Sequence, residues 1–158
     1  MKFEKFLKQV GTHGTVIERN ESEKWLVCDG VGMVIPRGVD NLLGTPTNNE
    51  YASIIDVLAD VEYDDPVKLK EAILLDPTGN AKAIYRVFET DLGDTVGIIN
   101  ADYGLLEKRD LLGFFEIEID CDEEGNPLPE DKVITIKYIL VFNHTGEIVG
   151  YITGSQRF

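Results

Sequence analysis

The strongest constraint on how this chain can fold is an alternation of apolar and acidic residues in the stretch FFEIEID, residues 114–120. A period of two places the apolar side chains on one face of a β-strand and the acids on the other. The stretch KVITIKYILVFN, residues 132–143, alternates as well. Between them lies a polar segment with the glycine and prolines that are typical of turns. The sequence therefore predicts two long strands joined by a polar turn.

The first 40 residues predict one helix followed by three strands. Apolar residues recur at helical spacing from Phe3 to Val10, and Gly11 follows where a helix would end. The runs TVIER, KWLVCDG and GMVIPRG, separated by NESE and by glycines, then predict a small antiparallel sheet. We expect the single tryptophan, Trp25, to pack in the core.

Two helices are predicted between about residues 50 and 75. The first is capped by Asn48 or Asn49 and carries apolar residues on one side, namely Ile54, Ile55, Leu58 and Val61. In DDPVKLKEAILL, residues 64–75, Asp65 stands at a cap position and Pro66 at the first helical position. This pattern predicts that a second helix begins there.

Strands are predicted again from about residue 81 to residue 153. The runs AKAIYRVFE, TVGIIN, LLGFFEIEID, KVITIKYILVFN and EIVGYITG are divided by turn signals, and ADYGLLEKRD can add one helical turn. We therefore expect a single α+β domain over residues 1–158, in which an antiparallel β-meander carries a few short helices packed on one face. Its parts are a weakly charged αβββ part over residues 1–40, the two helices, and the acidic meander.

The net charge of −14 lies almost entirely in the last two thirds of the chain. Residues 1–50 hold seven acids and six bases, whereas residues 51–158 hold twenty-two acids and nine bases. Such a charge repels nucleic acids and anionic lipid, and nothing in residues 1–14 resembles a signal peptide or a membrane span. We expect a cytoplasmic protein that binds neither nucleic acid nor membranes directly.

The sequence carries none of the common catalytic or cofactor signatures. Cys28 and Cys121 form no CxxC pair and have no histidine at ligand spacing, so we expect two reduced thiols, with a disulfide between them as the alternative. His13 and His144 lie in glycine-flanked turns without a nucleophile motif, and the segment DGVGMVIPRG holds a lone GxG without a third glycine. We expect no enzymatic activity and no cofactor.

The acidic segment DCDEEGNPLPED, residues 120–131, suggests a metal site as one alternative. Asp120, Asp122 and Glu124, followed by Gly125, match the first half of a calcium-binding loop. The second half departs from that pattern, since Asp131 replaces the bidentate glutamate and strands rather than helices flank the segment. A calcium or magnesium site at a hairpin end thus stands beside the simpler interpretation, a turn between two strands.

The same region predicts an acidic surface. Residues 116–131 hold eight acids and no base: Glu116, Glu118, Asp120, Asp122, Glu123, Glu124, Glu130 and Asp131. Alternate carboxylates on a strand lie about 7 Å apart and form a regular row of negative charge. Such a row can bind a basic protein surface, or it can imitate a phosphate backbone and occupy the basic groove of a nucleic-acid-binding protein. A solvated acidic face without a partner is the third alternative.

These observations favour a non-enzymatic, acidic protein-interaction module that binds a basic protein surface or assembles with copies of itself. Long apolar strands such as residues 133–142 are often protected by pairing with a second chain. Small acidic chains without a catalytic signature suit structural or accessory proteins, including those of mobile elements. The alternatives are a nucleic-acid-mimicking inhibitor and a divalent-metal or small-molecule-binding protein or enzyme that uses the 120–131 loop.

Overall fold

The computed structural model describes residues 1–39, 51–62, 67–70, 73–75 and 85–156. Within these ranges the chain forms three α-helices and ten strands. In chain order they are α1 (Phe3–Val10), β1 (Thr15–Asn20), β2 (Glu23–Cys28), β3 (Val31–Val34), α2 (Tyr51–Ala59), β4 (Val67–Lys68), β5 (Ile73–Leu75), β6 (Tyr85–Glu89), β7 (Thr95–Ile99), α3 (Asn100–Tyr103), β8 (Leu111–Ile119), β9 (Ile134–Phe142) and β10 (Ile148–Thr153).

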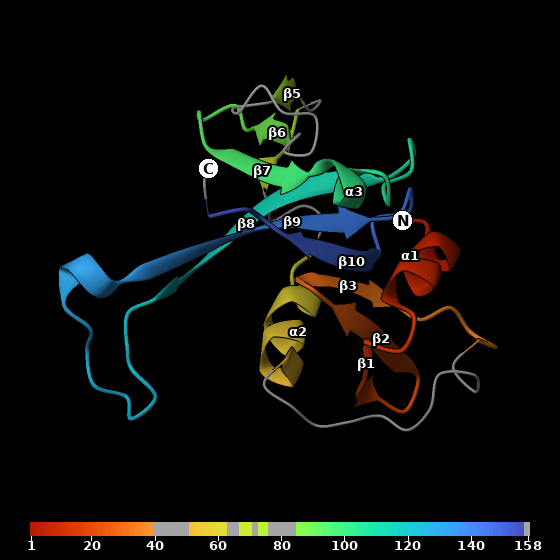
Figure 1. Ribbon diagram of the computed structural model, residues 1–158, viewed down its shortest axis with the longest axis horizontal. Coiled ribbons are helices and arrows are strands. Elements are labelled where there is room, and N and C mark those ends of the chain that lie inside the picture. The colour runs from red at the N-terminus through yellow and green to blue at the C-terminus, as the bar shows by residue number, and fades with distance from the viewer. Residues whose placement is uncertain (40–50, 63–66, 71–72, 76–84, 157–158) are drawn as a thin grey trace.

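The strands form two antiparallel sheets (Figure 1). The larger sheet has the order β1-β2-β3-β10-β9-β8-β4, and the smaller has the order β5-β6-β7. The last strand, β10, lies between β3 and β9, so the first and last thirds of the chain share one sheet. The antiparallel α+β prediction is confirmed, and the five predicted strands of the meander all form. The meander is nevertheless divided, since β6 and β7 belong to the small sheet.

The core consists of two apolar clusters that share strand β2. Leu26 belongs to a cluster with Phe6 of α1, whereas Trp25 and Val27 belong to a cluster with Leu58 of α2. Because successive residues of a strand point to opposite faces, α1 and α2 pack on opposite faces of β2. The expectation that the helices pack on one face is therefore not confirmed. The buried position of Trp25, which is 0% exposed, agrees with the prediction for that residue.

The predicted second helix, residues 64–75, is wrong where the structure describes that segment. Val67–Lys68 pairs with Phe114 and Gly113 of β8, and Ile73–Leu75 pairs with β6. Backbone partners in two neighbouring strands thus outweigh the local helix-start signal, which is only a weak preference. The proposed caps at Asn48, Asn49, Asp65 and Pro66 lie outside the described residues.

The remaining predictions concern the helices, the two cysteines and the absence of a membrane span. Helix α1 ends before Gly11, and α3 supplies the helical turn expected before β8. Helix α2 contains Ile54, Ile55 and Leu58 of the predicted apolar stripe, whereas Val61 lies beyond the end of the helix at Ala59. Cys28 and Cys121 are both free. Among the described helices, none has the length and apolar character needed to cross a membrane.

Candidate functional site

Strands β8 and β9 extend beyond their neighbours and form a projecting hairpin, which we call the arm (residues 116–136). The ladder between them runs from Leu111↔Phe142 to Ile119↔Ile134. Strand β10 accompanies β9 only as far as Tyr138, and β4 accompanies β8 only as far as Phe114. Beyond these points the described hairpin is a two-stranded ribbon, and Figure 1 shows it reaching away from the rest of the molecule.

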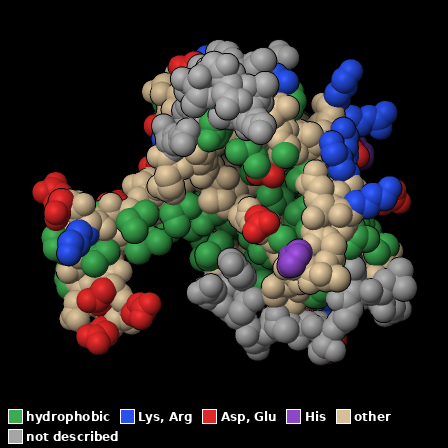
Figure 2. Space-filling view, in the orientation of Figure 1, with side chains coloured by type: hydrophobic (Ala, Val, Ile, Leu, Met, Phe, Trp, Pro, Cys, Tyr) green, Lys and Arg blue, Asp and Glu red, His purple; other side chains and the backbone are tan. Residues whose placement is uncertain are grey.

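The two faces of the arm differ in polarity. Directly opposed residues of an antiparallel ladder point to the same face. The pairs Ile117↔Ile136 and Ile119↔Ile134 therefore form an apolar face, and the pairs Glu116↔Lys137 and Glu118↔Thr135 lie on the other. In the space-filling view, apolar side chains follow the arm and acidic ones gather at its end (Figure 2).

Burial along the apolar face falls toward the tip. Ile117 and Ile136 still pack against the cluster that contains Trp25 and Tyr138. Ile119 and Ile134 are 39% and 50% exposed, respectively. The outermost apolar pair is thus held in place by the strand ladder, but it is largely uncovered within the described part of the chain.

The tip of the arm is an ordered turn built around Asp122. Its Oδ1 accepts hydrogen bonds from the backbone N–H groups of Glu124 and Asn126, both at 2.9 Å. Gly125 has a φ of +83°, a conformation that glycine adopts without a steric penalty. A 3₁₀ turn at Glu130–Lys132 then leads into β9. The polar segment therefore has a defined shape that fixes where its carboxylates lie.

The carboxylates proposed as metal ligands have hydrogen-bonding roles in this turn. The Asp120 Oδ1 accepts from the Cys121 thiol at 3.3 Å, and the Glu124 Oε2 accepts from Asn126 Nδ2 at 3.5 Å. The first of these contacts raises the pKa of Cys121, because the bond to the carboxylate favours the protonated thiol. Within the described residues, no three His, Cys, Asp or Glu side chains form a group that could hold a metal ion.

The predicted acidic residues all lie on the arm, but they do not form one flat face. Glu116 and Glu118 project from the strand face opposite the isoleucines, and Glu116 stands across from Lys137. Lys137 in turn donates a hydrogen bond to the Thr95 carbonyl oxygen at 2.9 Å. The other acids, at the tip and in the turn before β9, are exposed: Asp120, Asp122, Glu123, Glu124, Glu130 and Asp131.

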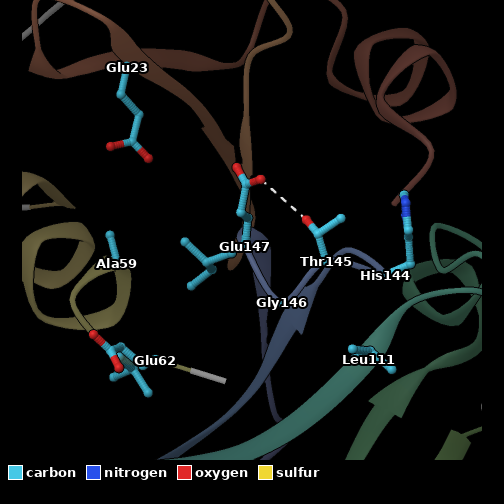
Figure 3. A pocket seen from close by; sticks show the side chains of 10 residues that line it. Glu23, Ala59, Glu62, Leu111, His144, Thr145, Gly146 and Glu147 are labelled. Carbon is cyan, nitrogen blue, oxygen red and sulfur yellow. Dashed lines mark hydrogen bonds between the residues drawn. The ribbon is translucent and has the colours of Figure 1, made fainter. Parts of the chain in front are cut away.

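A second candidate is an open pocket of about 700 Å³ between β2, the end of α2 and the turn before β10 (Figure 3). Glu23, Glu62 and Glu147 line it from these three elements. Glu23 accepts a hydrogen bond from Arg19 at 2.9 Å, and Glu147 accepts one from the Thr145 hydroxyl at 3.2 Å. Two of the three carboxylates are thus engaged within the fold.

Neither histidine forms a catalytic arrangement with its described neighbours. His144 lines the same pocket and lies on the far side of Thr145 from Glu23 and Glu62 (Figure 3). His13 is exposed in the turn after α1, where its backbone N–H donates to the Val10 carbonyl oxygen at 3.1 Å. Among the described residues, no hydrogen bond joins either imidazole to a carboxylate, hydroxyl or thiol.

Sequence reasoning identified the acids of the arm but missed its apolar face as a candidate site. The alternation of isoleucines in residues 117–119 and 134–136 carried that signal. The pattern alone predicts a strand with one buried face, and only the exposure of Ile119 and Ile134 in the fold shows that this face extends beyond the core. In searches against protein-family models, curated proteins and solved structures, nothing matched this chain.

Proposed function

We propose that this chain is a non-enzymatic protein-interaction module that docks on a partner protein through its arm. The observation that carries the proposal is the exposed Ile119↔Ile134 pair at the end of a projecting, two-stranded ribbon. A two-stranded ribbon is marginally stable when its apolar face meets water, and such faces mark interaction sites. A partner that covers this pair removes the apolar surface from water.

The charge of the arm defines the chemistry of the partner surface. Residues 116–136 hold eight acids and one base, Lys132, and much of the charge lies at the tip. We therefore expect an apolar strip flanked by lysine or arginine side chains. In such an interface the charges steer and orient the encounter, whereas the buried isoleucines slow dissociation.

Docking on a protein accounts for the arm better than imitation of DNA does. A mimic needs a regular row of carboxylates, and Lys137 stands opposite Glu116 where that row begins. The apolar face has no counterpart on a phosphate backbone. The experiment below separates the two, because a mimic depends on the acids and is indifferent to the isoleucines.

Affinity capture with two sets of arm variants tests the proposal. One set replaces the apolar pair, Ile119→Ser with Ile134→Ser, and the other replaces acids, Glu116→Gln, Glu118→Gln and Asp120→Asn. Val57→Ser is the matched control, because Val57 on α2 is also 50% exposed and is not a residue of the arm. A partner kept by the wild type and by Val57→Ser but lost from the isoleucine variant supports docking. Capture that the isoleucine variant leaves unchanged overturns it.

A further inference from the structure

The end of the molecule away from the arm carries a groove of about 590 Å³ between β4, α3 and the start of β8. Its floor is apolar and includes Leu69, Phe88, Leu106 and Leu112. Phe88 is 2% exposed and fixed in the core, so this part of the floor is rigid. The groove is thus a preformed apolar surface that a small hydrophobic side chain can enter.

Lysine side chains surround the groove. Lys2, Lys68, Lys70 and Lys108 all line it. Two acids, Glu107 and Asp110, lie among them, but Asp110 is almost fully buried in an ion pair with the Met1 ammonium at 2.8 Å. Figure 2 shows Lys and Arg side chains gathered on the edge of the molecule farthest from the arm. Lys70 is paired with Asp91 at 3.1 Å, and the lysines lining the groove still outnumber the acids that line it, in a protein whose net charge is −14.

The groove and the arm lie at the two ends of one strand. Leu111 and Leu112 at the start of β8 line the groove, and Ile119 at its end belongs to the apolar face of the arm. At about 3.3 Å per residue the two sites are roughly 25 Å apart along a rigid strand, and the arm points away from the groove. No arm can therefore reach the groove of its own molecule.

We propose that the arm of one copy of this chain docks in the groove of the next copy, head to tail. This inference rests on the proposed function and names its partner as a second copy. The isoleucine pair meets the leucines of the floor, and the acids at the tip meet the lysine rim. Both halves of the interface are present in one molecule, and their polarities are complementary.

Head-to-tail docking leaves a free arm at one end of the assembly and a free groove at the other end until the assembly closes. Such heterologous contacts generate a ring if the rotation between copies closes and a filament if it does not. The assembly is expected to depend on salt, because the tip and the rim are exposed charges. Half a molar sodium chloride should weaken it about tenfold or more relative to 50 mM.

Sedimentation of each variant on its own tests both halves of the interface. The arm variant is Ile119→Ser with Ile134→Ser, and the groove variant is Lys70→Glu with Lys108→Glu. Val57→Ser controls for the loss of an exposed apolar side chain, and Lys8→Glu on α1 controls for reversal of an exposed lysine outside the groove. We expect the wild type and both controls to form assemblies larger than dimers at low salt, and the arm and groove variants to sediment as monomers.

Mixing the two defective variants gives the decisive measurement. The arm variant keeps an intact groove, and the groove variant keeps an intact arm, so an equimolar mixture should form a one-to-one dimer and no larger species. A mixture that stays monomeric, or an arm variant that assembles as the wild type does, overturns head-to-tail docking.

The outcomes also separate this inference from the proposed function. A wild type that remains monomeric at low salt, yet captures another protein through Ile119 and Ile134, overturns the inference and leaves the proposed function standing. Capture and assembly that are both indifferent to the arm variant overturn the two together. Loss of assembly in the arm variant, with rescue in the mixture, supports both.

Discussion

Ile119 and Ile134 face each other in the outermost pair of the β8–β9 ladder, and both remain substantially exposed. Five residues further along β9, Ile139 pairs with Phe114 and is 0% exposed. The same strand thus carries one isoleucine in water and one in the core. This contrast separates residues that hold the fold together from residues that are available to a partner.

The first prediction compares one substitution at these two positions. Ile139→Ala should lower the free energy of unfolding by about 2–5 kcal/mol, because it leaves a cavity in the core. Ile134→Ala should cost less than about 1 kcal/mol, because the side chain is half exposed and no cavity forms. Urea unfolding of the two variants measures both values. Equal costs would mean that the arm packs against the body in solution.

The second prediction concerns the pH dependence contributed by Asp102. Burial, and then the nearby charge of Asp29, raises the pKa of Asp102 to about 6 from its ordinary value of 3.8. The protonated carboxyl therefore contributes stability that is fully present below pH 3.8 and is lost as the pH rises through about 6. At neutral pH the folded protein carries an unfavourable carboxylate at this position.

Asp102→Asn should raise the free energy of unfolding at pH 7.5 by roughly 1 kcal/mol, a value reduced from the full shift because the group is partly solvated. The gain should vanish near pH 3.5. Thermal unfolding across this range gives the measurement, and Asp131→Asn in the exposed turn before β9 is the control. A gain that persists unchanged at pH 3.5 would contradict this assignment.

The third prediction uses the thiol at the tip of the arm. Since the bond to Asp120 raises the pKa of Cys121, the thiolate fraction at pH 8 is smaller than in a free cysteine. In a Cys28→Ala background, Asp120→Asn should accelerate alkylation of Cys121 by iodoacetamide at this pH. Asp131→Asn leaves the bond to the thiol intact and should alter the rate less. Equal acceleration by both variants would point to general charge rather than to the bond.

The fourth prediction tests the contact between the first and last thirds of the chain. Gly32 of β3 pairs with Tyr151 of β10, and a Cβ atom at position 32 would overlap the tyrosine ring. That ring is held between Trp25 and Tyr138, whose ring centroids lie 6.1 Å and 5.9 Å from it. Gly32→Ala should therefore cost about 1–3 kcal/mol of stability.

A double-mutant cycle checks the cause of that loss. Combining Gly32→Ala with Tyr151→Leu, which replaces the ring by a smaller and more flexible side chain, should cost less than the sum of the two single variants. Strict additivity would show that the alanine acts on something other than the ring.

Local patterns in the sequence predicted the elements well wherever one face of a strand or helix meets the core. The alternation in residues 114–120 and the helical spacing from Phe3 to Val10 reflect burial of one face, and both elements form as expected. The helix prediction for the segment around Val67 and Lys68 was wrong. A proline and an aspartate there resemble a helix start, whereas backbone pairing with β8 decides the outcome. This pairing joins residues that are far apart in the sequence, so a short stretch of sequence contains no signal for it.

The candidate site was predicted only in part for a similar reason. Sequence alone located the acids of residues 116–131, since charge is a property of each residue. It did not reveal the exposed apolar face, which depends on how far the core cluster extends along the hairpin. Nor did it reveal the lysine-rimmed groove, because Lys2, Lys70 and Lys108 meet only through the fold.

The position of β10 between β3 and β9 has a consequence for how the chain is made. During synthesis, the αβββ part leaves the ribosome with the β3 edge open, and its partner Tyr151 follows only after most of the chain has been translated. At 5–20 residues per second this interval lasts roughly 6 to 24 s. For that time an unpaired strand edge is available to any other nascent chain, so slower translation should lower the soluble yield even though the finished sheet is closed at this position.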